Sequence, residues 1–177
     1  MRPSHAARLL IVPGLQDSGP AHWQTWLQGL HRHSVRVQQA DWHQPDLARW
    51  SETITRTLDQ AGAGPWIAVG HSFGCLALVQ HLADMPASPI HAALLVAPAD
   101  PERRAVLNDF APVPYERLPY RSIVVGSTND PYCPVHLAGA YARAWGSEFV
   151  RLPDAGHINV ESGHGEWPLG LALLQSL

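Results

Sequence analysis

The stretch Trp66–Gly74 constrains the fold of this chain more than any other. Its apolar first half, Trp-Ile-Ala-Val, leads into Gly-His-Ser-Phe-Gly, and the apolar segment 75–82 that follows is compatible with a helix. This order predicts a strand, a sharp turn and a helix, with Ser72 at the turn. A serine on such a turn has a strained backbone and an exposed hydroxyl, which is the arrangement of a nucleophile elbow. Gly70 and Gly74 supply the space that the strand and the helix need where they approach each other.

The composition favours a compact globular protein. With 177 residues, of which 46% are hydrophobic and 15% charged, the chain suits one domain over residues 1–177 with a substantial core. A net charge of −3 without long runs of either sign predicts neither a nucleic-acid surface nor a membrane surface. No apolar run approaches the ~20 residues of a membrane span. Residues 1–9 lack the apolar stretch of a signal peptide, so we expect a cytoplasmic protein.

Motifs for cofactors and metals are missing from the sequence. Neither a phosphate loop of the Gly-Lys-Ser/Thr type nor Gly-x-Gly-x-x-Gly occurs. The two cysteines, Cys75 and Cys133, are too few for a disulfide framework or a zinc site. His31 and His33 form a His-x-His pair without an evident third metal ligand. Together these observations lead us to expect no cofactor and no metal. Cys75 lies one helical turn beyond the serine and is interpreted as a buried small hydrophobic residue rather than a nucleophile.

Short apolar runs alternate along the chain with segments of helical periodicity. The predicted strands are the apolar run from Trp66 and residues 8–13, 35–39, 91–97, 121–126 and 149–152. The predicted helices cover about 20–30, 46–60, 75–82, 137–145 and 167–177, with a short helix near 102–107 inside the irregular stretch 99–120. The alternation predicts a three-layer α/β fold with about six mostly parallel strands. Because no insertion is long enough for a large lid, we expect an open site at the C-terminal ends of the strands.

The serine of the elbow needs two partners. A hydroxyl is a poor nucleophile unless a base takes its proton, and a carboxylate should orient that base. On this fold the expected chain order is serine, acid, histidine, each after a strand. Asp130 follows the fifth predicted strand and His157 follows the sixth, after Gly156, whose backbone freedom helps to aim the ring. The sequence therefore predicts Ser72, Asp130 and His157 as catalytic residues.

Other residues compete for these two roles. Taken alone, Asp130 before a proline is also typical of a turn that caps a helix. Asp154 shares a loop with His157 and is interpreted as a turn residue, and Asp100 after the fourth predicted strand is a weaker candidate for the acid. His164 is an alternative base, but it lies further from its strand.

Acyl transfer also requires N–H donors for the developing oxyanion. On this architecture the residue after the nucleophile, Phe73, supplies one donor and the loop after the first strand supplies the other. That loop reads Pro-Gly-Leu-Gln over residues 13–16. Gly14 lets it turn, which makes the Leu15 N–H the preferred second donor and the Gln16 N–H the next. An ordinary Pro-Gly turn is the alternative interpretation.

Candidates for substrate binding flank these donors. They are Gly14, Gln16, His22 and His71. Trp23, next to His22, is compatible with a pocket wall and equally with the core. The expected substrate is a small acyl compound.

Several separated motifs together resemble one protein family. They are Pro-Gly at 13–14, His-Trp at 22–23, Asp-Trp at 41–42 with Pro45, Gly-His-Ser-Phe-Gly at 70–74, Ser-Thr-Asn-Asp-Pro-Tyr-Cys-Pro at 127–134, Ala-Gly-His-Ile-Asn at 155–159 with Gly163, and Trp-Pro at 167–168. This combination runs over nearly the whole chain and resembles the small serine hydrolases typified by retinoblastoma-binding protein nine. The resemblance implies a minimal α/β-hydrolase without the first two strands of larger relatives. It also implies Ser72 as nucleophile, Asp130 as acid and His157 as base.

The expected function is a cofactor-independent serine hydrolase that cleaves a small ester, thioester or amide through an acyl-enzyme. The resemblance names no physiological substrate, because those of the family are poorly defined. Its vertebrate member is associated with a pocket-protein partner, but the chain has no clear Leu-x-Cys-x-Glu segment, so a protein partner is not indicated. The alternative is a catalytically silent interaction module on a hydrolase fold, since a fold does not fix a function.

Overall fold

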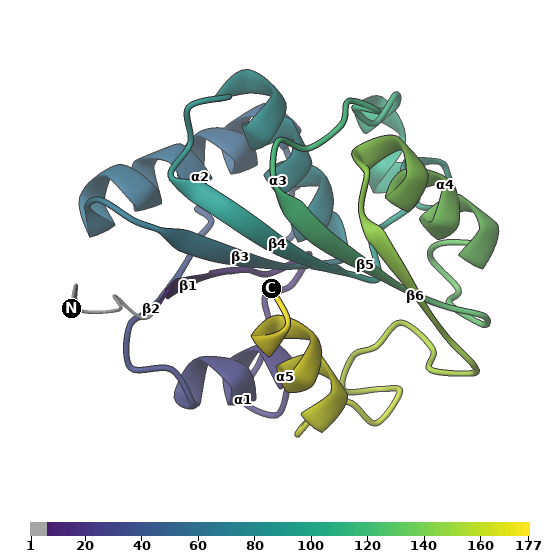
Figure 1. The fold of residues 1–177 in the computed structure, drawn as a ribbon. Helices are drawn as coiled ribbons and strands as arrows, with labels where there is room; N and C mark the ends of the chain where they lie inside the picture. Colours follow the sequence, from purple (N-terminus) through teal and green to yellow (C-terminus); the bar gives the residue numbers. More distant parts are fainter. Residues whose placement is uncertain (1–6) are drawn as a thin grey trace.

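A six-stranded parallel sheet forms the centre of the molecule (Figure 1). The computed structural model describes residues 7–177. The strands are β1 (Arg8–Val12), β2 (Ser34–Arg36), β3 (Trp66–His71), β4 (Ile90–Val96), β5 (Arg121–Ser127) and β6 (Glu148–Leu152). Their order in the sheet is β2-β1-β3-β4-β5-β6, and every neighbouring pair is parallel. The strand order changes direction between β1 and β3, and ligands of open α/β sheets bind at such a switch point.

Helices cover both faces of this sheet. One face carries α1 (Trp23–Gly29) and α5 (Pro168–Gln175), and the other carries α2 (Leu47–Ala61), α3 (Phe73–Asp84) and α4 (Val135–Trp145) (Figure 1). The predicted three-layer α/β fold is therefore confirmed, with strands that are all parallel.

Alternating side chains of the strands supply two hydrophobic cores. In β1, Leu10 and Val12 belong to the core under α2, α3 and α4, whereas Leu9 and Ile11 belong to the core under α1 and α5. Every residue of β3 is buried, because both of its faces are covered. This double burial explains why the central strands read as continuous apolar runs in the sequence.

The predicted edge strand and the predicted short helix in the irregular stretch 99–120 differ from the observed elements. The edge strand predicted over 35–39 is β2 at Ser34–Arg36, which is shorter and begins one residue earlier. The short helix predicted near 102–107 is a pair of 3-10 helices, η1 (Pro101–Arg103) and η2 (Ala105–Phe110). Arg104 separates them because its backbone is extended, with φ −130° and ψ 117°.

No helix within residues 7–177 is long and apolar enough to cross a membrane.

Candidate active site

Ser72 occupies a strained turn between β3 and α3. Its φ of 55° and ψ of −126° lie outside the regions that residues with a Cβ normally adopt. At Gly70 an added Cβ would lie 3.3 Å from Cys75, so this glycine permits the close approach of strand and helix. At Gly74 an added Cβ would lie 2.5 Å from the carbonyl oxygen of Pro13. The expectation for Gly74 is thereby corrected, since this glycine makes room for the end of β1 rather than for β3.

The three predicted catalytic side chains meet in one hydrogen-bonded line. His157 Nε2 lies 2.9 Å from Ser72 Oγ, and His157 Nδ1 lies 3.0 and 2.9 Å from the two carboxylate oxygens of Asp130. A carboxylate accepts hydrogen bonds only, so Nδ1 carries the proton and Nε2 offers a lone pair to the serine hydroxyl. All three residues are buried. The arrangement therefore allows His157 to take the proton of Ser72, although the catalytic roles themselves stay a prediction.

Hydrogen bonds between two loops fix the distance between the acid and the histidine. The Asn129 side-chain oxygen accepts the backbone N–H of Gly156 at 2.7 Å, and Ser127 Oγ accepts the N–H of Ala155 at 3.0 Å. Gly156 has φ +59°, the left-handed conformation that its lack of a side chain permits. The loop after β5 therefore holds the loop after β6 in register.

Two ring N–H groups hold the backbone carbonyls of His157 and Ile158. His71 Nε2–H donates to the His157 carbonyl at 3.0 Å, and Trp23 Nε1–H donates to the Ile158 carbonyl at 2.8 Å. Ile158 itself has φ +47°, which is costly for a β-branched residue, and its side chain is fully buried. Burial, with His157 and His22 nearby, lowers the pKa of His71 well below its ordinary value, so the ring is neutral. Trp23 thus belongs to the core and also supports the candidate site.

The predicted oxyanion donors lie on adjacent backbone segments. An added Cβ on Gly14 would lie 2.9 Å from Ser72 Cβ and 3.4 Å from the Phe73 nitrogen, so the loop after β1 touches the elbow. Phe73 begins α3, where backbone N–H groups lack helical partners and the helix dipole is positive. The Gln16 N–H, the second choice for a donor, is engaged by the Trp42 carbonyl at 3.0 Å. Leu15 and Phe73 remain the predicted pair.

A polar cleft of about 350 Å³ opens over Ser72 and His157. Three of the four predicted substrate-binding residues line it, namely Gln16, His22 and His71. Gly14 instead packs against the elbow backbone. His22 Nδ1 accepts the backbone N–H of Gln24 at the start of α1, and burial, with Arg36 nearby, lowers its pKa to about 4. His22 is therefore neutral at neutral pH.

Sequence reasoning missed several residues that line this cleft. They are Asp17, Gly19, Arg104, Tyr132, Asn159, Val160 and Glu161. Tyr132 stands two residues after the acid, and its ring packs edge-on against His157 with centroids 4.7 Å apart. Its position beside Asp130 was the available signal. Arg104 lies in the irregular stretch 99–120, where no pattern in the sequence marks it.

The competing candidates lie apart from the line of three. Asp154 is exposed and accepts the Thr128 hydroxyl, and Asp100 accepts the Glu102 N–H at the start of η1. His164 Nδ1 contacts the Ser162 hydroxyl. Cys75 is fully buried, and burial raises its thiol pKa far above the ordinary value, in agreement with its interpretation as a small hydrophobic residue. Among residues 7–177, no three His, Cys, Asp or Glu side chains are grouped so that they would hold a metal ion.

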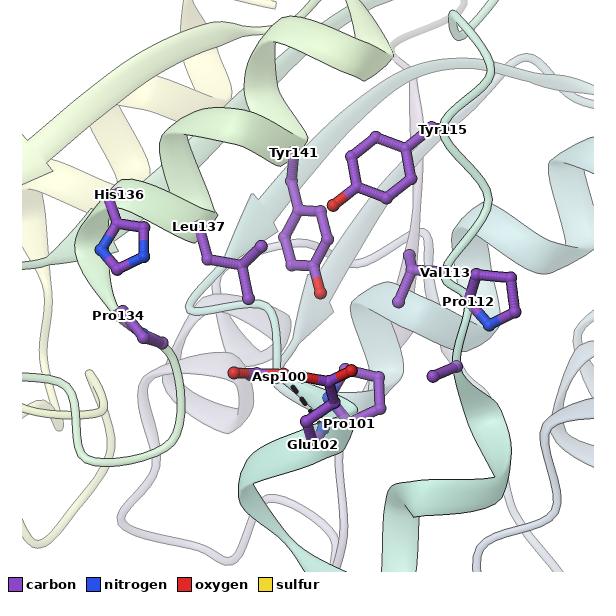
Figure 2. Close-up of a pocket in the computed structure, with 11 residues that line it drawn as sticks. Asp100, Pro101, Glu102, Pro112, Val113, Tyr115, Pro134, His136, Leu137 and Tyr141 are labelled. Carbon is purple, nitrogen blue, oxygen red and sulfur yellow. Dashed lines mark hydrogen bonds between the residues drawn. The ribbon is translucent and has the colours of Figure 1, made fainter.

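A larger cavity of about 560 Å³ lies between the segment after β4 and helix α4 (Figure 2). The phenol groups of Tyr115 and Tyr141 and the carboxylates of Asp100 and Glu102 surround it. None of the three predicted catalytic residues lines it. The segment after β4 contributes to both spaces, because residues 100–102 line this cavity and Arg104 lines the polar cleft.

Comparisons with known proteins agree with this architecture. A family model described as serine hydrolase matches residues 9–176. The structure of a YdeN-like hydrolase from Pectobacterium atrosepticum is 37% identical over 96% of this chain and 89% of that one, with a TM-score of 0.86. The ydeN product of Bacillus subtilis is 19% identical over 97% and 98%, with a TM-score of 0.82. Est1E from Butyrivibrio proteoclasticus is 16% identical over 99% and 88%, with a TM-score of 0.73. No curated protein sequence matches the chain.

Proposed function

Because this chain belongs to the serine hydrolase family, we propose that it cleaves a small acyl ester, thioester or amide through a Ser72 acyl-enzyme. The observation that supports this most is the strained backbone of Ser72. Its hydroxyl lies 2.9 Å from His157, which is hydrogen-bonded to the buried carboxylate of Asp130. Strain at a residue with a Cβ persists only where the surrounding structure enforces it, and it is concentrated at functional sites.

The proposed reaction has two halves. Ser72 Oγ attacks the acyl carbonyl while His157 Nε2 takes its proton, and Asp130 stabilises the resulting imidazolium. The tetrahedral intermediate then collapses, the bond to the leaving group breaks, and Nε2–H protonates that group. Water enters, His157 takes one of its protons, and the hydroxide adds to the acyl carbon. Collapse of the second intermediate releases the acid and returns the proton to Ser72.

Backbone N–H groups supply the proposed stabilisation of the oxyanion. The Leu15 N–H and the Phe73 N–H come from the two segments that meet at Gly14. Phe73 also stands at the positive end of α3, a helix of 12 residues. A single donor of this kind is worth roughly 10²- to 10³-fold in kcat.

Steady-state hydrolysis of p-nitrophenyl esters from acetate to octanoate tests this proposal. We expect Ser72→Ala to lower kcat by about 10⁴-fold or more, because the nucleophile is lost. Ser88→Ala is the matched control, since Ser88 also hydrogen-bonds a histidine, His81, at 2.9 Å. That control should keep activity within about twofold of the wild type. Full activity in a folded Ser72→Ala protein would contradict the proposal.

A further inference from the structure

Arg104 brings a positive charge to the candidate active site. It lies in the extended link between η1 and η2, and its half-buried side chain lines the cleft together with Ser72 and His157. The preceding residue, Arg103, is exposed, lies 3.8 Å from Asp100 and does not line the cleft. Two successive arginines therefore have different environments, and one of them faces the proposed reaction centre.

The Arg104 guanidinium lies over the ring of Tyr132. The Arg104 Cζ atom stands 4.9 Å from the centroid of the Tyr132 ring, within the range of a cation–π contact. That ring packs edge-on against His157, and the Tyr132 backbone N–H donates to the Asp130 carboxylate at 2.9 Å. The Tyr132 ring therefore contacts both the guanidinium and His157, the proposed base.

Among residues 7–177, the ion pairs within 4 Å do not include Arg104. Of the acids that line the cleft, Asp17 pairs with Arg36 at 2.8 Å and Glu161 is exposed. His22 also lines the cleft but is neutral there.

We propose that Arg104 binds a carboxylate on the substrate, so that the enzyme acts preferentially on small acyl compounds that carry a negative charge. A planar guanidinium held on an aromatic face offers two parallel N–H donors to a carboxylate, with more geometric specificity than a lysine ammonium. The polar walls of the cleft, which include Gln16 and Asn159, suit a substrate with a charged end. This inference rests on the proposed serine hydrolase function.

Matched esters test the inference and locate the charge. The first pair is 4-acetoxybenzoate and its methyl ester, in which the carboxylate belongs to the leaving group. The second pair is mono-p-nitrophenyl adipate and its methyl ester, in which the carboxylate belongs to the acyl chain. The kcat/KM of each ester is measured for the wild type, Arg104→Gln, Arg104→Lys and the control Arg103→Gln, after thermal unfolding has shown that every variant is folded. Comparing variants on each ester cancels intrinsic differences in reactivity.

In at least one pair, Arg104→Gln should lower kcat/KM for the carboxylate ester by tenfold or more and change the methyl ester by less than twofold. Arg104→Lys should restore part of the loss, and Arg103→Gln should change neither ester. Added NaCl should slow hydrolysis of that carboxylate ester by the wild type more than by Arg104→Gln. An equal effect of Arg104→Gln on both members of each pair, or no effect on either, would overturn the inference while leaving the hydrolase proposal intact. A wild type that hydrolyses none of the four esters would overturn both.

Discussion

Two serine–histidine pairs with the same hydrogen-bond length occur in this molecule, and their surroundings differ. Ser72 Oγ lies 2.9 Å from His157 Nε2, and Ser88 Oγ lies 2.9 Å from His81 Nε2. Behind His157 stands the Asp130 carboxylate, whereas behind His81 stands the Thr55 hydroxyl, 3.1 Å from Nδ1.

The backbone also separates the two pairs. Ser72 is strained at a strand–helix turn beneath a cleft, whereas Ser88 follows α3, and its N–H donates to the Met85 carbonyl. Burial lowers the pKa of His81 to about 4, although the charges of Asp84 and Asp59 act in the opposite direction. A serine–histidine hydrogen bond is therefore only one component of the proposed site. The carboxylate, the backbone strain and the nearby N–H donors are the features that distinguish Ser72.

Removing the negative charge behind His157 should lower activity more than any other change that tests the comparison of the two pairs. We expect Asp130→Asn to lower kcat by about 10³- to 10⁴-fold, because an amide can stabilise the wrong tautomer of the histidine and does not balance its cation. Ester hydrolysis measures this effect, and circular dichroism confirms the fold. The matched change Thr55→Val behind His81 should keep kcat within about twofold. Near-normal activity in Asp130→Asn would show that the carboxylate is dispensable.

Filling the space at the elbow should destabilise the protein. In Gly74→Ala, the added Cβ would overlap the backbone at the end of β1, which has little freedom to move. We expect a loss of about 1–3 kcal/mol in the free energy of unfolding, measured in urea. Gly29→Ala is the control, because its Cβ would meet no atom within 4 Å. If the two variants proved equally stable, the close packing described at the elbow would be contradicted.

His81 should make the stability of the fold sensitive to acid, although it has no part in the proposed catalysis. The folded His81 has a pKa of about 4, below the ordinary 6.5 of the unfolded chain, so the unfolded state binds more protons between these values. Stability contributed by the neutral ring is therefore complete above about pH 6.5 and decreases as the pH falls toward 4. The loss between pH 7 and pH 5 should be smaller in His81→Gln by about 2 kcal/mol. Urea unfolding at both pH values measures this, and an unchanged pH dependence would refute it.

Giving the second pair a carboxylate should produce the smallest effect. Thr55→Asp would place an acid behind His81, but Ser88 would still lack an elbow and a cleft. We expect no labelling of Ser88 by a fluorophosphonate, and ester hydrolysis in the Ser72→Ala background should stay at the background rate. Measurable turnover would show that the three side chains suffice without the strained backbone.

The sequence predicted the parts of the site that depend on local order. Ser72, Asp130 and His157 each follow a strand, and parallel strands bring their C-terminal ends to one edge, so their meeting follows from the topology. The hydrogen bonds that hold the backbone at His157 connect residues far apart in the sequence. His71 precedes His157 by 86 residues, and Trp23 precedes Ile158, whose carbonyl it binds, by 135 residues. No local periodicity reports such contacts.

The position of Arg104 in the cleft could not be predicted either, because no local pattern in the sequence indicates it. It belongs to an irregular segment with several prolines, in which neither a period of 2 nor one of 3.6 residues indicates the direction of a side chain. Its approach to Tyr132 depends on how η1 and η2 pack. The resemblance at residues 127–134 included Tyr132 but did not assign it a role.

Labelling with a fluorophosphonate, followed by mass-spectrometric identification of the modified residue, tests the central claim most directly. The probe reacts covalently with activated serines, so the wild type and Ser88→Ala should both be modified at Ser72. Ser72→Ala and His157→Ala, shown to be folded, should remain unlabelled. Labelling at any other residue, labelling that persists without Ser72, or a folded wild type that does not react would contradict the assignment of Ser72 as the activated nucleophile.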